Sequence, residues 1–288
     1  MSENKNTLDH SNWNLSDVIR QAKSGEPLVV SESVLGKVNE NRQYLEQKLA
    51  GKKEAIYGIN TGFGSLCHTI IPTDGLEDLQ VNLVRSHACG TGDLVDKDII
   101  RLMILLKIKS LSYGYSGIRV ELLNKLVSFY NEGICPVIYE QGSLGASGDL
   151  APLAHMSLSL MGEGEVHSDE GMKPSLDILQ TKGIQPLKLQ AKEGLALLNG
   201  TQFMLAHLVH CLHEGIKMWH QAHEIAALSI EGFNCRLSPY FEGLGQIRAH
   251  EGQQKSAEMI RKLLHDSGLE QAEGKAVQDP YSFRCIPQ

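Results

Sequence analysis

The sequence predicts a mainly α-helical protein, in which an N-terminal helical domain with a few short strands leads into an incomplete central bundle of long helices. Apolar residues recur at helical spacing over most of the 288 residues, and residues 201–230 continue this pattern without a break. The chain is longer than one average domain. We therefore expect one domain over residues 1–200 and the first part of a helical bundle over residues 201–288.

The first sixty or so residues alternate helices with short extended segments. Residues 14–23 predict a short amphipathic helix, and residues 28–30 predict a strand. Ser31 is a favourable N-cap for a helix that runs to about Leu49. Residues 54–57 predict a second extended segment, which leads into a glycine-rich loop.

Helices dominate the middle of the chain. Thr73 and Asp74 are expected to open one helix. Apolar residues cover most of the circumference of the next helix, residues 96–113, which is therefore expected to be buried. Another helix follows over residues 117–131, and residues 135–139 then extend into a second glycine-rich loop.

The remaining predicted elements are also helices. Asp149 is placed to cap a helix that carries Pro152 in its first turn. Residues 174–182 and 253–265 predict two further helices on either side of the long one. A long apolar helix needs several partners to cover it, yet only one clear helix follows, so we expect a chain cut within a domain.

Composition excludes several classes of function. The net charge is −7 and there is no basic block, so no nucleic-acid partner is expected. The uninterrupted apolar runs are too short to span a bilayer, and the polar N-terminus does not resemble a signal sequence. Six cysteines without a CxxC pair indicate reduced thiols. These features predict a cytoplasmic protein with no membrane partner.

The tripeptide Ala146-Ser147-Gly148 carries the most specific chemistry. If its turn brings the Gly148 nitrogen onto the Ala146 carbonyl carbon, a ring closes, and loss of two waters leaves a methylidene-imidazolone. Gly148 has no Cβ to obstruct its nitrogen, and Ser147 supplies the leaving group for the exocyclic alkene. The alternative is an ordinary flexible loop. The helix predicted after Asp149 places this electrophile at a positive helix N-terminus.

Three candidate site residues lie outside that loop in the first domain. Tyr57 is a candidate proton acceptor, although taken alone it is more typical of a tyrosine with its ring in the core. His87 is a candidate contact for a polar ring, although a helix C-terminus favours histidine on its own. Asn199 is a candidate substrate-binding amide or, more commonly, a cap for the long helix.

The last cluster contains Gln278, Tyr281 and Arg284. Arg284 can hold a carboxylate in a bidentate geometry that lysine cannot reproduce, and the alternative is a loop arginine paired with an acidic neighbour. A metal site on the histidines of the long helix is not expected, because none falls in an HExxH frame. These histidines are His207, His210, His213, His220 and His223.

Five blocks, in this order along the chain, closely resemble the aromatic amino acid ammonia-lyases, and among them the members that act on histidine: residues 57–64, 86–92, 142–152, 198–202 and 278–284. The resemblance implies a methylidene-imidazolone made autocatalytically from Ala146, Ser147 and Gly148, with no external cofactor and no metal. It also implies an amino-acid substrate, with histidine converted to trans-urocanate and ammonia.

The same resemblance assigns roles to the other side chains. Tyr57 takes the β-proton, and Arg284 binds the substrate carboxylate with help from Asn199. His87 lies beside the substrate side chain, where it suits an imidazole or a phenol better than a plain phenyl ring. Two further residues complete the pocket, the catalytic Tyr281 and Gln278.

Members of this family are considerably longer, and their active sites combine residues of more than one subunit of a homotetramer. We therefore expect this chain to be a fragment, with activity belonging to the full-length enzyme. Two alternatives stay open. One is a tyrosine ammonia-lyase or aminomutase of the same family, and the other is a catalytically silent, truncated helical oligomerisation module.

Overall fold

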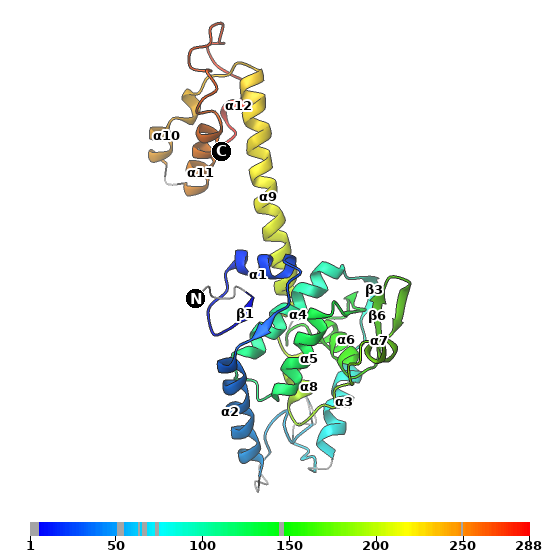
Figure 1. Ribbon diagram of the computed structural model, residues 1–288. Coiled ribbons are helices and arrows are strands. Elements are labelled where there is room, and N and C mark those ends of the chain that lie inside the picture. The colour runs from blue at the N-terminus through cyan, green and yellow to red at the C-terminus, as the bar shows by residue number, and fades with distance from the viewer. Residues whose placement is uncertain are drawn as a thin grey trace. The chain divides into compact units, whose positions relative to one another are not determined.

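The computed structural model describes residues 6–50, 55–62, 64, 68–72, 75–143, 147–248 and 250–288. Helices make up most of this structure, which confirms the predicted fold class (Figure 1). The chain divides into two compact units, Met1–His210 and Cys211–Gln288. The division falls within the long helix α9 (Gln202–Gly232).

The N-terminal elements include the predicted helix, strand and helix in the expected order, and a two-residue strand that was not predicted precedes them. They are β1 (Thr7–Leu8), α1 (Leu15–Lys23), β2 (Val29–Val30) and α2 (Glu32–Leu49). The two strands pair in parallel. The Ser31 side chain accepts a hydrogen bond from the Val34 amide, so the predicted cap of α2 is confirmed.

The extended segment predicted over residues 54–57 is wrong in its described part. Residues 57–60 form turns instead. The reason is local, because the Asn60 side-chain oxygen accepts a 2.6 Å hydrogen bond from the Ile56 amide and the Asn60 amide donates back to the Ile56 carbonyl. Glu54 lies outside the described residues.

Four helices build the core of the first unit. They are α3 (Leu76–His87), α4 (Lys97–Ser112), α5 (Val120–Asn131) and α6 (Leu150–Leu160). Helix α4 is buried on almost every side, as predicted from its apolar circumference. Thr73 and Asp74, which were expected to open α3, lie outside the described residues.

Short strands bring distant segments together. Strand β3 (Thr91–Leu94) pairs antiparallel with β5 (Tyr139–Gln141), which joins the segment after α3 to the start of the tripeptide loop. A three-stranded sheet contains β4 (Cys135–Pro136), β6 (Glu165–Ser168) and β7 (Gly171–Pro174). The sequence reasoning did not identify β3, β6 or β7.

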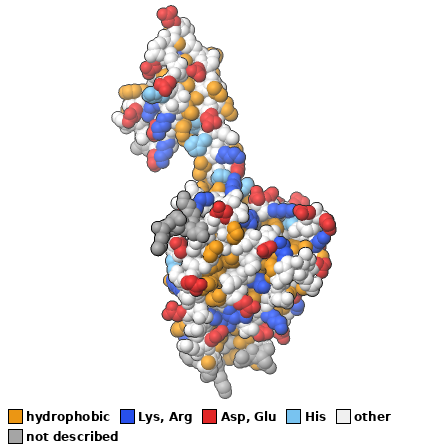
Figure 2. Space-filling view, in the orientation of Figure 1, with side chains coloured by type: hydrophobic (Ala, Val, Ile, Leu, Met, Phe, Trp, Pro, Cys, Tyr) orange, Lys and Arg blue, Asp and Glu red, His pale blue; other side chains and the backbone are white. Residues whose placement is uncertain are grey.

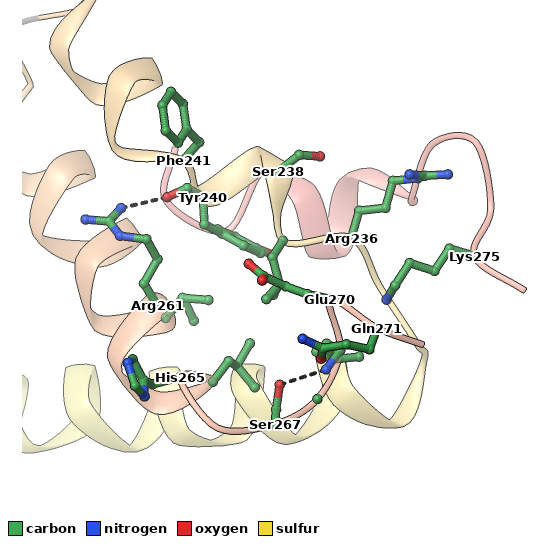
Figure 3. A pocket seen from close by; sticks show the side chains of 15 residues that line it. Arg236, Ser238, Tyr240, Phe241, Arg261, His265, Ser267, Glu270, Gln271 and Lys275 are labelled. Carbon is green, nitrogen blue, oxygen red and sulfur yellow. Dashed lines mark hydrogen bonds between the residues drawn. The ribbon is translucent and has the colours of Figure 1, made fainter. Parts of the chain in front are cut away.

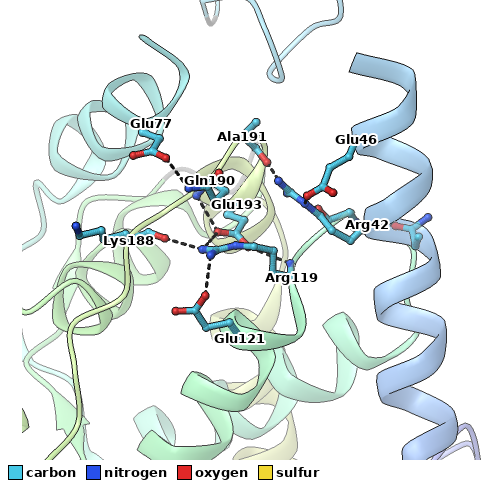
Figure 4. A network of polar contacts seen from close by, with 11 residues as sticks. Arg42, Glu46, Glu77, Arg119, Glu121, Lys188, Gln190, Ala191 and Glu193 are labelled. Carbon is cyan, nitrogen blue, oxygen red and sulfur yellow. Dashed lines mark hydrogen bonds and ion pairs between the residues drawn. The ribbon is translucent and has the colours of Figure 1, made fainter. Parts of the chain in front are cut away.

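The chain then forms α7 (Ser175–Thr181) and α8 (Glu193–Leu198), which leads into α9. A buried polar network fixes the start of α8 (Figure 4). Glu193 is fully buried and accepts two hydrogen bonds from the Arg119 guanidinium, at 3.0 and 2.8 Å. Arg42 donates to the carbonyls of Gly117 and Ala191 at 3.0 Å each. Such a satisfied network orients the segment that carries Asn199.

The second unit contains the C-terminal part of α9 and four short elements. These are η3 (Ser238–Tyr240), α10 (Glu242–Gln246), α11 (Glu251–Leu263) and α12 (Tyr281–Arg284). Its small core includes Ile230, Tyr240 and Ile260. His223 of α9 bonds to the Ser256 hydroxyl of α11 at 2.7 Å and thereby joins the two helices.

Helix α9 is strongly apolar and largely exposed. Ile225 and Leu228 are 65% and 70% exposed, and Figure 2 shows hydrophobic side chains at the surface of the second unit. By length and composition alone, the stretch Glu193–Gly232 is long and apolar enough to cross a membrane. The core helix of a soluble protein passes the same test. The sequence analysis predicted most of this stretch as a long bundle helix and did not consider it as a membrane span, because it looked only for uninterrupted apolar runs.

Candidate active site

The tripeptide loop is packed against the turn that precedes α9. Gly148 has φ of +99°, and a Cβ placed on it would overlap the carbonyl oxygen of Gly200. Only glycine allows the two backbones to approach this closely. The Ser143 hydroxyl donates a 3.2 Å hydrogen bond to the Gly148 carbonyl. Ser147 is exposed, whereas Ala146 lies outside the described residues.

Asp149 joins this loop to α9. Its amide donates a 2.7 Å hydrogen bond to the Gly200 carbonyl. Its buried carboxylate accepts hydrogen bonds from the amides of Phe203 and Met204, both at 3.0 Å. The prediction that its side chain caps the following helix is therefore wrong. Asp149 occupies the N-cap position of α6, but its side chain caps α9, because the contact with Gly200 brings that helix N-terminus within reach.

A lysine missed by the sequence reasoning lies beneath the same turn. Lys107 of α4 is 1% exposed, and its Nζ donates to the Asn199 carbonyl at 3.1 Å and to the Gln202 side-chain oxygen at 3.5 Å. Burial lowers the pKa of Lys107 to about 7, against the opposing effect of the Asp149 carboxylate. The apolar pattern of α4 gave no signal for this role.

The segment after His87 packs against Gly142, which precedes the tripeptide. A Cβ on Gly142 would lie 3.0 Å from the Gly90 Cα, and the Gly90 amide donates a 3.0 Å hydrogen bond to Nε2 of His155. Burial lowers the pKa of His155, which favours the neutral imidazole that accepts this bond. His87 is the last residue of α3, and its Nδ1 bonds to the Leu83 carbonyl at 2.9 Å.

The structure does not give Asn199 and Tyr57 the commoner roles, which are a helix cap and a ring in the core. The Asn199 side chain does not cap α9; it is exposed and donates to the Leu195 carbonyl at 3.3 Å. Tyr57 is 58% exposed, so its ring is not in the core, and its hydroxyl accepts a 3.5 Å hydrogen bond from the Gly64 amide. That Tyr57 and Asn199 act on a substrate stays a prediction.

The last cluster belongs to the second unit. Gln278 and Tyr281 are exposed, and the Arg284 guanidinium lies 4.0 Å from the centre of the Tyr281 ring. Arg284 Nε donates to the Asp279 carbonyl at 3.0 Å, and no acidic side chain among the described residues pairs with it. The guanidinium is therefore held without a carboxylate partner. That these three residues join the tripeptide loop stays a prediction.

The second unit also has a cavity of about 630 Å³, which none of the predicted site residues lines (Figure 3). Its three cations already bond to backbone carbonyls. Arg236, Arg261 and Lys275 donate to the carbonyls of Ala276, Tyr240 and Cys235, each at 2.6 Å. These cations stabilise the unit and give no sign of a ligand. The described residues contain no group of three His, Cys, Asp or Glu able to hold a metal ion.

In the described structure, the loop that carries Ser147 and Gly148 packs against the turn before α9. A family profile described as "Aromatic amino acid lyase" matches residues 13–288. The chain belongs to this family.

Individual relatives extend the comparison. A histidine ammonia-lyase of Bacillus subtilis is 44% identical over 98% of the chain and 56% of its own length. A Trypanosoma cruzi histidine ammonia-lyase structure is 33% identical with a TM-score of 0.85, over 98% of the chain and 52% of its own. The structure of a tyrosine aminomutase from Streptomyces globisporus is 34% identical with a TM-score of 0.89, over 98% of this chain and 57% of its own length. The chain spans about half the length of the curated relatives it matches.

Proposed function

We propose that this chain belongs to an ammonia-lyase that converts L-histidine to trans-urocanate and ammonia. The packing of Gly148 against Gly200 supports the proposal, since Gly148 follows Ser147, Gly200 follows Asn199, and the N-termini of α6 and α9 lie beside this contact. Similarity to histidine ammonia-lyases supports histidine as substrate.

The residues present fit a methylidene-imidazolone at positions 146–148. Gly148 lies in a cradle that a Cβ would fill, and Ser147 is open to an incoming amine. When formed, this group supplies an electrophilic carbon that makes the amino group of the substrate a better leaving group. The described N-termini of α6 and α9 favour negative charge that develops beside it.

The chain's own side chains would bind and orient the amino acid. Arg284 would hold the carboxylate in two parallel hydrogen bonds, with Asn199 assisting. Tyr57 would accept the β-proton, and His87 would contact the imidazole of the substrate. Gln278 and Tyr281 would complete the pocket, with Tyr281 in the catalytic set. The exposure of Tyr57 and Tyr281 in the single chain is compatible with a site completed by other segments or subunits.

We further propose a cytoplasmic homotetramer with neither nucleic-acid nor membrane partner. The exposed apolar residues of α9 support the homotetramer, because a bundle of helices from several subunits would cover them.

A second candidate is a tyrosine ammonia-lyase or aminomutase, favoured by the structural likeness to tyrosine aminomutase. Offering histidine, tyrosine and phenylalanine to the purified protein separates the two candidates. Urocanate from histidine supports the first, and coumarate or β-tyrosine from tyrosine supports the second. A Ser147→Ala variant is the control, since it carries no leaving group. Intact mass tests the silent helical module, because a tripeptide that has not formed the ring retains both waters.

A further inference from the structure

We propose that Lys107 is a positioning residue for closing the tripeptide ring, an inference that rests on the proposed function. Its Nζ holds the turn from Asn199 to Gln202 by donating to the Asn199 carbonyl and the Gln202 side chain. This turn presents Gly200, whose backbone lies directly against Gly148. Lys107 therefore positions the Gly200 backbone against which Gly148 packs.

Ring closure depends on how tightly the bend is held. The Gly148 nitrogen bonds to the Ala146 carbonyl carbon, and the Ala146 oxygen leaves as water with the amide hydrogens of Gly148 and Ser147. The Ser147 hydroxyl leaves as a second water with its Cα hydrogen. No oxidant, reductant or second reactant is needed. A backbone amide is a weak nucleophile, so approach of the two atoms must be enforced by the surrounding structure.

Two hydrogen bonds hold the C-terminal end of the tripeptide in place. Ser143 donates to the Gly148 carbonyl, and the Asp149 amide donates to the Gly200 carbonyl. The second contact holds only if Gly200 stays in place. Lys107 is the buried donor beneath that turn, and both its ammonium and its amine form carry N–H donors.

Helix α4 offers a matched control. Lys109 is also buried, and its Nζ donates to the carbonyls of Asp9 and Ser11 at 2.9 and 2.7 Å. Replacing either lysine by methionine removes a buried donor from the same helix. Only Lys107 touches the turn beside the tripeptide.

The test is the ring content of each folded variant, read as the loss of the mass of two waters from the peptide that contains residues 146–148. The protein is expressed as its gene encodes it, and the folded fraction is isolated by gel filtration. We expect Lys107→Met to lower ring content by roughly tenfold or more, because small displacements of reacting atoms cost large factors in rate. Lys109→Met keeps the parent value. Lys107→Arg, which retains N–H donors, restores at least roughly half of it.

The outcomes separate the two proposals. Ring content in Lys107→Met equal to the parent, or an equal loss in Lys109→Met, overturns the role of Lys107 and leaves the proposed function intact. A parent protein with no mass loss overturns the proposed function itself. If Lys107→Met does not fold, Lys107→Gln, which keeps a shorter donor, is compared with Lys107→Arg by the same measurement. Ring contents that equal the parent value in both variants overturn the inference.

Discussion

The carbonyl oxygen of Gly200 accepts a 2.7 Å hydrogen bond from the amide of Asp149, so the tripeptide loop and the turn before α9 form one packed backbone unit. The Asp149 carboxylate strengthens the same junction by capping α9. Two segments about fifty residues apart in the chain are thereby held together at the tripeptide loop.

The contact between Gly148 and Gly200 predicts a large cost for a methyl group at position 148. We expect Gly148→Ala to lower the free energy of unfolding by about 3 kcal/mol or more, because the Cβ meets backbone and φ is unfavourable. Gly133→Ala is the control, since it has φ of +65° and open space around its Cβ. It is expected to cost only about 1 kcal/mol. Both are measured by denaturant unfolding in a Ser147→Ala background, where no ring forms, and equal costs contradict the packing.

The capping role of Asp149 predicts different effects for two substitutions. Asp149→Ala removes both accepted hydrogen bonds and leaves Lys107 without its nearby carboxylate, which is expected to cost about 2–4 kcal/mol of unfolding free energy. Asp149→Asn keeps an acceptor oxygen for the α9 amides and is expected to cost less than roughly half of that. Denaturant unfolding of the two variants gives the comparison, and an equal loss would show that the cap contributes nothing.

The depressed pKa of Lys107 predicts a pH-dependent difference in stability. Its folded value of about 7 lies below the unfolded value of about 10.4, so between these values the unfolded chain binds a proton that the folded protein lacks. Raising the pH across this window therefore favours the folded state. Relative to Lys107→Met, the parent should gain about 2–3 kcal/mol between pH 7.5 and 9.5. A constant difference across these pH values contradicts the burial of a titrating amine.

The proposed carboxylate contact predicts a specific kinetic effect at Arg284. Lysine cannot form the two parallel hydrogen bonds of a guanidinium, so Arg284→Lys should raise KM for histidine by roughly ten- to a hundredfold. Arg236→Lys is the control in the same unit, because that guanidinium bonds to a backbone carbonyl of Ala276. Steady-state kinetics of the protein as its gene encodes it measures both, and equal KM values for Arg284→Lys and the parent rule out the contact.

Much of the fold could be predicted because its signals are local. The long pattern of α9 and the apolar circumference of α4 identify these helices, and the Ser31 cap follows from a side chain three residues from its partner. Strands β3, β6 and β7 were missed, because each has only four residues and β3 is exposed throughout. Pairing with distant strands stabilises them, and sequence periodicity does not report such pairing.

The sequence predicted the parts of the candidate site that depend on neighbouring residues, and it missed the contacts between distant segments. The tripeptide Ala146-Ser147-Gly148 could be found from its residue types alone. Asp149 was predicted to cap the helix that directly follows it, because N-cap rules consider only neighbouring residues. The α9 partner is more than fifty residues away, and its proximity depends on Gly200. Lys107 lies inside an apolar run, where a single cation looks like an interruption rather than part of a site.

The mass of the peptide that spans residues 146–148, taken from protein that deaminates histidine, tests the central claim most directly. We predict a peptide that is lighter than its sequence by two water molecules, and a peptide of full mass in Ser147→Ala. A peptide of unchanged mass from protein with undiminished histidine turnover would contradict it.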